Sequence, residues 1–140
     1  MNLTAVYLKR DERVREYQAK GKYNLPQNVY LRTLYLIRDY DRLREEYTEI
    51  LYRSPPPPDG QPGSRKVSDE TAEKAIKMEA VARECRAVEQ AIVCIPEEYR
   101  SGVVNNVMYR VPYPDTAGYA TWSRHRRKFI QNVAQNMHYI

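Results

Sequence analysis

Two stripes of regularly spaced side chains, separated by a run of prolines, place the strongest constraint on how this chain folds. Members of the first stripe lie 4, 3, 4, 3, 4 and 3 residues apart, and members of the second lie 3, 4, 3, 4, 3, 4 and 3 apart. Both stripes have the 3.5-residue period of a coiled-coil seam, which predicts helices over about 28–53 and 68–95. The stripes are Val29, Thr33, Leu36, Tyr40, Leu43, Tyr47 and Ile50, and Thr71, Lys74, Met78, Val81, Cys85, Val88, Ile92 and Ile95.

The segment between the stripes ends the first helix. Residues 54–64 contain five prolines and two glycines, and proline both removes a backbone donor and disfavours the helical region for the residue before it. We therefore expect an exposed linker over 54–66 that joins the two helices into a long antiparallel hairpin over 29–95. Of 15 aromatic residues 13 are tyrosine, whose apolar ring and polar hydroxyl suit half-buried seams. Residues 1–28 precede the hairpin as a mixed-charge lead segment.

Residues 96–140 form a second unit in this interpretation. Pro96 is tolerated in the first turn of a helix, which predicts a helix over 96–110 whose inner side includes Tyr99, Val103 and Val107. The prolines within 112–115 interrupt it, and Thr121 precedes a last helix that runs to about residue 139. The predicted fold is all-α: a long antiparallel helical hairpin followed by a helix-turn-helix-like unit.

The last helix is amphipathic and basic. Residues 121–140 hold four basic residues and no acidic one, in a chain whose formal net charge is +5. A helical wheel places Trp122, His125, Phe129, Val133 and Ile140 in one narrow arc, and Arg124, Arg127, Lys128, Gln131 and Gln135 opposite. The second helix of a helix-turn-helix enters the DNA major groove, with its N-terminal residues at the base edges. The candidate DNA-binding residues are Ser123, Arg124, Arg126, Arg127, Lys128 and Gln131.

No combination of side chains argues for catalysis, so we expect a protein that is not an enzyme. His125 lies on the inner arc, His138 has no acidic or thiol companion nearby in sequence, and no Gly-rich phosphate loop is present. Cys85 and Cys94 are roughly 13 Å apart along one helix, which is too far for a disulfide. Without a Cys/His cluster they read as two buried thiols, and we expect no metal and no cofactor.

The sequence also lacks the signals of export and membrane insertion. No apolar run approaches the roughly 18 residues of a membrane-spanning helix. The first ten residues do not combine a basic start with an apolar stretch, as a secretory signal does. We therefore expect a cytoplasmic protein that makes no membrane contact.

Several segments of the C-terminal half resemble a family of prophage proteins. Residues 87–100, then Tyr113-Pro114-Asp115, then 121–129 are similar to the RinA/ArpU-type phage transcriptional regulators of Gram-positive bacteria. Their C-terminal half resembles sigma factor region 4. There a helix that opens with Pro-x-x-Tyr-Arg, here Pro96 to Arg100, precedes a turn and a recognition helix. The resemblance covers residues 87–140 and implies a regulator that binds double-stranded DNA.

We therefore expect a phage-type DNA-binding transcriptional regulator with a sigma region 4-like helix-turn-helix. Its basic residues would dock on phosphates, and Ser123, Arg124, Arg127 and Lys128 are the candidates for reading bases. Two alternatives stay open. One is a small terminase-like DNA-packaging component, in which the hairpin assembles a homo-oligomeric ring. The other is a helical protein-interaction module that docks a partner such as RNA polymerase without specific DNA binding.

Overall fold

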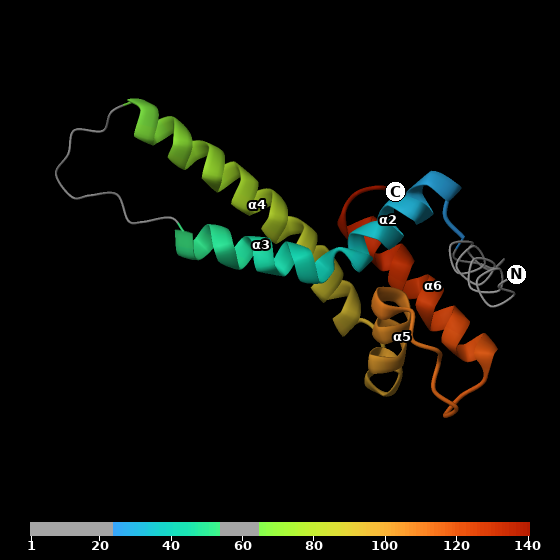
Figure 1. The fold of residues 1–140 in the computed structure, drawn as a ribbon. Helices are drawn as coiled ribbons and strands as arrows, with labels where there is room; N and C mark the ends of the chain where they lie inside the picture. The colour runs from blue at the N-terminus through green and yellow to red at the C-terminus, as the bar shows by residue number, and fades with distance from the viewer. Residues whose placement is uncertain (1–23, 54–64) are drawn as a thin grey trace, which may run out of the picture.

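The computed structural model describes residues 24–53 and 65–140, the first four of the second range by their backbone alone. Within these ranges the chain is helical and forms no strand, which confirms the all-α class. The helices are α2 (Gln27–Arg38), α3 (Tyr40–Arg53), α4 (Arg65–Val93), α5 (Glu97–Tyr109) and α6 (Tyr119–Asn136) (Figure 1). The lead segment up to residue 23 and the linker over 54–64 lie outside the described residues.

The prediction of one continuous helix over 28–53 is wrong, because a turn at Asp39 divides it into α2 and α3. The Asp39 carboxylate accepts hydrogen bonds from the Arg42 guanidinium, and aspartate favours such local bonds over a helix interior. The two helices also have different partners, since α2 packs on α5 and α6 whereas α3 packs on α4. The predicted hairpin is therefore built by α3 and α4, and α2 belongs to the C-terminal part of the molecule.

Helices α3 and α4 pair in antiparallel fashion. The Tyr40 hydroxyl at the start of α3 donates to Glu89 late in α4 at 2.7 Å, and Glu46 farther along α3 pairs with Lys77 earlier in α4 at 3.4 Å. Buried side chains fill the seam nearest the body of the molecule, and they include Leu43, Val81, Cys85 and Val88. For this part of both stripes, the prediction that the regularly spaced residues are buried between the two helices is confirmed.

The two stripes do not meet over their full length. Thr71 and Lys74, predicted as seam residues of α4, are exposed, and Ile50 of α3 is only half-buried. Figure 1 shows α3 and α4 diverging toward the linker. The physical reason is the composition of that end: charged side chains line both helices there, and they retain their hydration only when the helices stand apart.

The core of the C-terminal part is organised around Trp122. Its indole stacks on Tyr113, with ring centroids 5.7 Å apart, and meets the edge of Tyr99 at 5.2 Å. It also lies directly against Gly102 of α5, where a Cβ would stand 2.6 Å from an indole carbon. Glycine is a poor helix former, so this packing explains its place in the interior of α5.

One continuous cluster of buried side chains draws on all five helices, from Leu25 to Ala134. The junction between α4 and α5 lies inside this cluster and is closed by Arg100 of α5. Its guanidinium donates to the carbonyl oxygens of Ile92, Val93 and Ile95 at 3.1 Å each. Ile92 and Val93 belong to the last turn of α4, whose carbonyls lack the usual helical donors four residues on, and Ile95 follows the helix. Arg100 therefore caps α4 and ties α5 to it.

We predict that Gly102→Ala destabilises the protein by about 1–3 kcal/mol, because the added methyl group overlaps Trp122 in a close-packed site. Urea unfolding followed by circular dichroism measures the free energy. Gly118→Ser is the matched control: a Cβ at Gly118 meets nothing within 4 Å, and serine suits the N-cap position that Gly118 occupies. Equal stability of the Gly102→Ala variant and the parent would contradict this account of the core.

Candidate nucleic-acid interface

Helix α6, which carries the predicted DNA-binding residues, lies at the centre of the C-terminal part. It begins at Tyr119, three residues before the predicted start, and packs against α2, α4 and α5. Its inner face is buried from Trp122 to Ala134, whereas Ile140, which the wheel placed on that face, is 51% exposed. The helix ends at Asn136, so Ile140 falls outside the helical register on which the wheel depends.

One stripe of α6 faces solvent, and we call it the outer stripe. Arg124, Lys128 and Gln135 are exposed and Gln131 is half-buried, and these four residues are spaced 4, 3 and 4 apart. That spacing keeps them on one side of the helix. Arg124 and Lys128 are therefore the cations of α6 that a docked molecule meets first.

Ser123 lies on the opposite side. Only 6% of its surface is exposed, because it stands beside Trp122 on the face that enters the core. Ser123 is not a member of the narrow inner arc that the helical wheel defines. The packing of three helices around α6 widens the buried face and takes Ser123 out of reach of a ligand on the outer stripe.

Arg126 is engaged inside the protein. Its Nε donates to the Asn106 side-chain oxygen of α5 at 3.1 Å, and a terminal nitrogen donates to the Tyr30 hydroxyl of α2 at 3.0 Å. Tyr30 is 1% exposed, so the guanidinium reaches deep between the helices. Arg127 is half-buried. The predicted DNA-binding residues therefore do not share one surface. Arg126 joins three helices, whereas Arg124, Lys128 and Gln131 lie together on the outer stripe.

The two exposed cations of α6, Arg124 and Lys128, differ from most cations of the hairpin because no carboxylate that the structure describes pairs with them. Most exposed cations on α3 and α4 lie within 4 Å of a glutamate or aspartate oxygen, namely Arg42, Arg44, Arg53, Lys77 and Arg86. Lys74 and Arg83 are exposed without an ion pair to a described residue. Within the described residues, neither Arg124 nor Lys128 forms an ion pair or a hydrogen bond. Two unpaired cations one helical turn apart attract anions more strongly than paired ones, since no carboxylate offsets their charge.

His125 sits beside these cations, on the α5 side of α6. Its ring stacks on Tyr99 with centroids 4.4 Å apart. Burial lowers the pKa of His125 below its ordinary 6.5, and the nearby charges of Arg124 and Lys128 lower it further, against a small opposing effect of Glu98. A neutral imidazole therefore packs on Tyr99 at neutral pH.

The C-terminal end of α4 forms the border of the outer stripe. Cys94, Ile95 and Pro96 share a narrow cleft with Lys128 and Asn132 of α6. Cys94 is exposed there, so the expectation that both thiols are buried holds for Cys85 only. Its position relative to the stripe could have shown this, because Cys85 belongs to the predicted seam whereas Cys94 falls between the seam residues Ile92 and Ile95.

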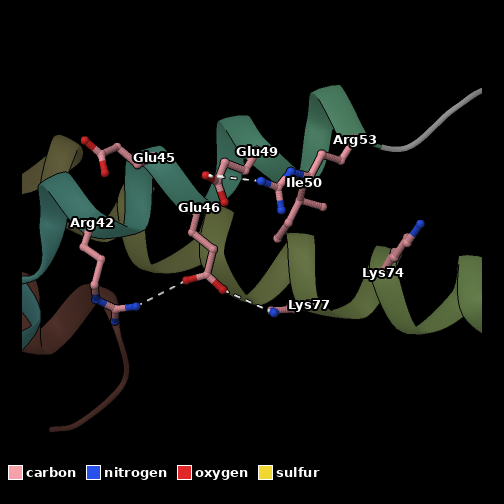
Figure 2. Close-up of a pocket in the computed structure, with 8 residues that line it drawn as sticks. All are labelled: Arg42, Glu45, Glu46, Glu49, Ile50, Arg53, Lys74 and Lys77. Atoms are coloured by element: carbon pink, nitrogen blue, oxygen red, sulfur yellow. Dashed lines mark hydrogen bonds and ion pairs between the residues drawn. The ribbon is translucent and has the colours of Figure 1, made fainter.

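A larger groove of about 500 Å³ lies at the far end of the hairpin (Figure 2). Figure 2 shows Glu46 between Arg42 and Lys77, with an ion pair to each at 3.4 Å. Glu49 pairs with Arg53 at 3.9 Å in the same groove. Opposite charges alternate around its walls, so the groove attracts neither an anion nor a cation strongly.

Other candidate sites are missing from the part of the chain that the structure describes. Residues 24–53 and 65–140 contain no group of three or more His, Cys, Asp and Glu side chains placed to hold a metal ion. None of their helices combines the length and apolar character that crossing a membrane requires. Comparisons with protein-family models, with curated proteins and with solved structures gave no match to this chain.

The lowered pKa of His125 predicts a pH-dependent stability. The unfolded chain has the ordinary pKa near 6.5, so it takes up a proton before the folded protein does as the pH falls. We expect the free energy of unfolding to decrease as the pH drops through and below 6.5. In His125→Phe, which keeps a ring on Tyr99 and cannot titrate, this decrease should be smaller. Thermal unfolding at a series of pH values measures it.

The control is His138→Asn, since His138 is exposed and its positive φ of 58° suits asparagine. This variant should keep the pH dependence of the parent. If the stability curves of His125→Phe and the parent run parallel between pH 7 and 5, the half-buried imidazole of His125 is not the source of the pH dependence.

Proposed function

We propose that this chain is a DNA-binding transcriptional regulator that docks on double-stranded DNA through the outer stripe of α6. The observation that carries the proposal is the unpaired state of Arg124 and Lys128 on a helix that is otherwise buried by its neighbours. Phosphate oxygens are the partners that such cations lack, and phosphate contacts supply most of the affinity of proteins for DNA.

The distribution of charge along the chain agrees with this proposal. Residues 99–140 contain six Lys and Arg residues and a single acidic residue, Asp115. The preceding 98 residues contain equal numbers of basic and acidic residues. A positive potential on one part of the molecule steers it toward a polyanion and orients that part toward the duplex.

The resemblance to RinA/ArpU-type regulators supports the same function, and the structure gives physical roles to the residues on which it rests. Tyr99 supports both Trp122 and His125 of α6, and Arg100 caps α4. Tyr113 stacks on the indole ring of Trp122, which Tyr99 meets edge-on. In this chain the Pro-x-x-Tyr-Arg segment is therefore a scaffold that holds α6 with its basic stripe outward, which is the task of the helix before a recognition helix.

We place base contacts at the N-terminal end of the stripe. Arg124 lies one turn closer to the start of α6 than Lys128, and the N-terminal residues of a recognition helix reach base edges. Ser123 and Arg126 are left out of the proposed contact, because one is buried and the other bonds to Tyr30 and Asn106.

We predict that the double variant Arg124→Ala/Lys128→Ala binds duplex DNA more weakly than the parent at low salt. Each phosphate contact contributes about −0.9 to the slope of log K against log salt, so loss of the Lys128 contact should flatten the slope by about one contact. If Arg124 reads a base, the single Arg124→Ala variant should also discriminate less between sequences. Fluorescence anisotropy titrations at several salt concentrations measure both effects.

The matched control is Arg53→Ala/Lys74→Ala, which removes the same charge at the groove of the hairpin. It should bind as the parent does, since those side chains lie far from α6 along the hairpin. Equal binding by the parent and a folded Arg124→Ala/Lys128→Ala variant would overturn the proposal. Transcription from a template that carries the bound sequence then separates regulation from the terminase-like packaging alternative.

A second candidate function, a helical protein-interaction module, is favoured by the exposed apolar side chains at the far end of the hairpin. Leu51 and Tyr52 of α3 are 50% and 81% exposed, and Ile76 of α4 is 72% exposed. Exposed large apolar side chains on neighbouring helices can serve as a contact surface. A second copy of the chain is the simplest partner, and the packaging alternative requires such self-association.

If this end is a contact surface between copies, Tyr52→Ser/Ile76→Ser should lower the average mass at high protein concentration, because the exposed apolar area would be lost. Light scattering coupled to gel filtration measures the mass. Tyr35→Ser is the control, since Tyr35 is 51% exposed on α2, away from the hairpin end. A parent that stays monomeric across the concentration series would exclude self-association through this surface.

A further inference from the structure

Helices α4 and α6 lie side by side and run in opposite directions. In the middle of α6, Lys128 shares a cleft with Cys94, the residue that follows α4. Near the end of α6, the Asn136 side chain donates to the carbonyl oxygen of Ala87, at 3.0 Å. The two helices therefore remain in contact over about two turns, and the outer stripe of α6 continues directly onto the surface of α4.

The α4 residues along this border are polar or basic. Ala87 and Ala91 are buried toward α6, and Arg83, Gln90 and Cys94, spaced within one turn of them, are exposed. We call the combined surface the α4–α6 strip: Arg83 and Gln90 of α4, Cys94 directly after α4, and Lys128, Gln131 and Gln135 of α6. It contains no acidic side chain.

Arg83 shares the unpaired state of Arg124 and Lys128. It is exposed and forms no ion pair with any residue that the structure describes. Its neighbour Arg86, by contrast, pairs with Glu79 at 2.9 Å. Along α4 the eleven residues between Arg83 and Cys94 span roughly 16 Å, so Arg83 and Lys128 lie at opposite ends of a strip about half as long as one turn of B-DNA.

We infer that α4 forms part of the DNA contact: Arg83 binds a phosphate at one end of the α4–α6 strip while Lys128 binds another, and Gln90 donates to the sugar-phosphate backbone between them. This inference rests on the proposed function and extends it, because the sequence resemblance assigns DNA contacts to the last helix alone. A guanidinium suits the Arg83 position, since its planar donors match two phosphate oxygens at once. Cys94 then lies inside the covered surface.

The first test removes the charge of Arg83. Raising the salt from 50 to 200 mM weakens DNA binding by a certain factor in the parent, and in Arg83→Ala that factor should be about 3.5 times smaller. This is the effect of losing one phosphate contact. Lys74→Ala is the matched control: Lys74 is on the same helix, exposed and equally charged, but lies toward the hairpin end. It should leave the salt dependence of DNA binding unchanged. Circular dichroism confirms that both variants are folded.

The second test uses Cys94 as a reporter. N-ethylmaleimide should modify one thiol of the folded protein, because Cys94 is exposed and Cys85 is buried. Duplex DNA at low salt should slow this modification severalfold, and high salt should restore the rate as the complex dissociates. A Cys94→Ser variant gives the background reaction of Cys85.

The outcomes separate the inference from the function on which it rests. If Arg124→Ala/Lys128→Ala weakens binding while Arg83→Ala behaves as Lys74→Ala does and DNA leaves Cys94 fully reactive, α4 makes no contact and the inference is overturned. If Arg124→Ala/Lys128→Ala binds as the parent does, the proposed function itself fails. Weakened binding of Arg83→Ala together with protection of Cys94 supports both.

Discussion

The packing of Trp122 against Gly102 is the contact on which the C-terminal part of the molecule depends. A glycine in α5 lets the backbones of α5 and α6 approach closely enough for the indole to fill the space between them. Tyr99 and Tyr113 then enclose the ring from two other directions. Because a close-packed core tolerates little change in volume, this arrangement fixes the rotation of α6 about its own axis. The side of α6 that faces solvent follows from that rotation.

Electrostatic pairing distinguishes the two ends of the protein. At the hairpin end, glutamates form ion pairs with neighbouring cations, as Glu46 does with both Arg42 and Lys77. Around α6 few acids are present, and the cations either bond to neutral groups inside the protein, as Arg126 does, or stay in water. Exposed ion pairs contribute little to stability, so the contrast matters for recognition more than for folding. On the outer stripe of α6 an anionic partner meets two cations, Arg124 and Lys128, that have no carboxylate partner among the described residues.

Much of the fold could be predicted from the sequence because helix-forming patterns are local. The 3.5-residue stripes, the proline run and Pro96 placed the helices near their observed positions, and the buried part of the hairpin seam followed from spacing alone. The turn at Asp39 could not be predicted in the same way. The stripe runs through that position without interruption, and the turn follows from the bonds of Asp39 to Arg42 together with the different partners of α2 and α3. The exposure of Thr71 and Lys74 likewise depends on how far α3 and α4 diverge.

The candidate site shows the same division. By itself the sequence determined that a basic amphipathic helix ends the chain, since the order of residues sets which charges share a helix and which face carries the apolar ones. Only the tertiary structure decided which of four adjacent cations are presented to a partner. Arg126 turns inward because Tyr30 and Asn106, 96 and 20 residues away in sequence, come to lie beside it and satisfy its donors. Arg83 joins Lys128 on one surface because α4 and α6 pack antiparallel, and such contacts between distant segments exist only once the core has formed.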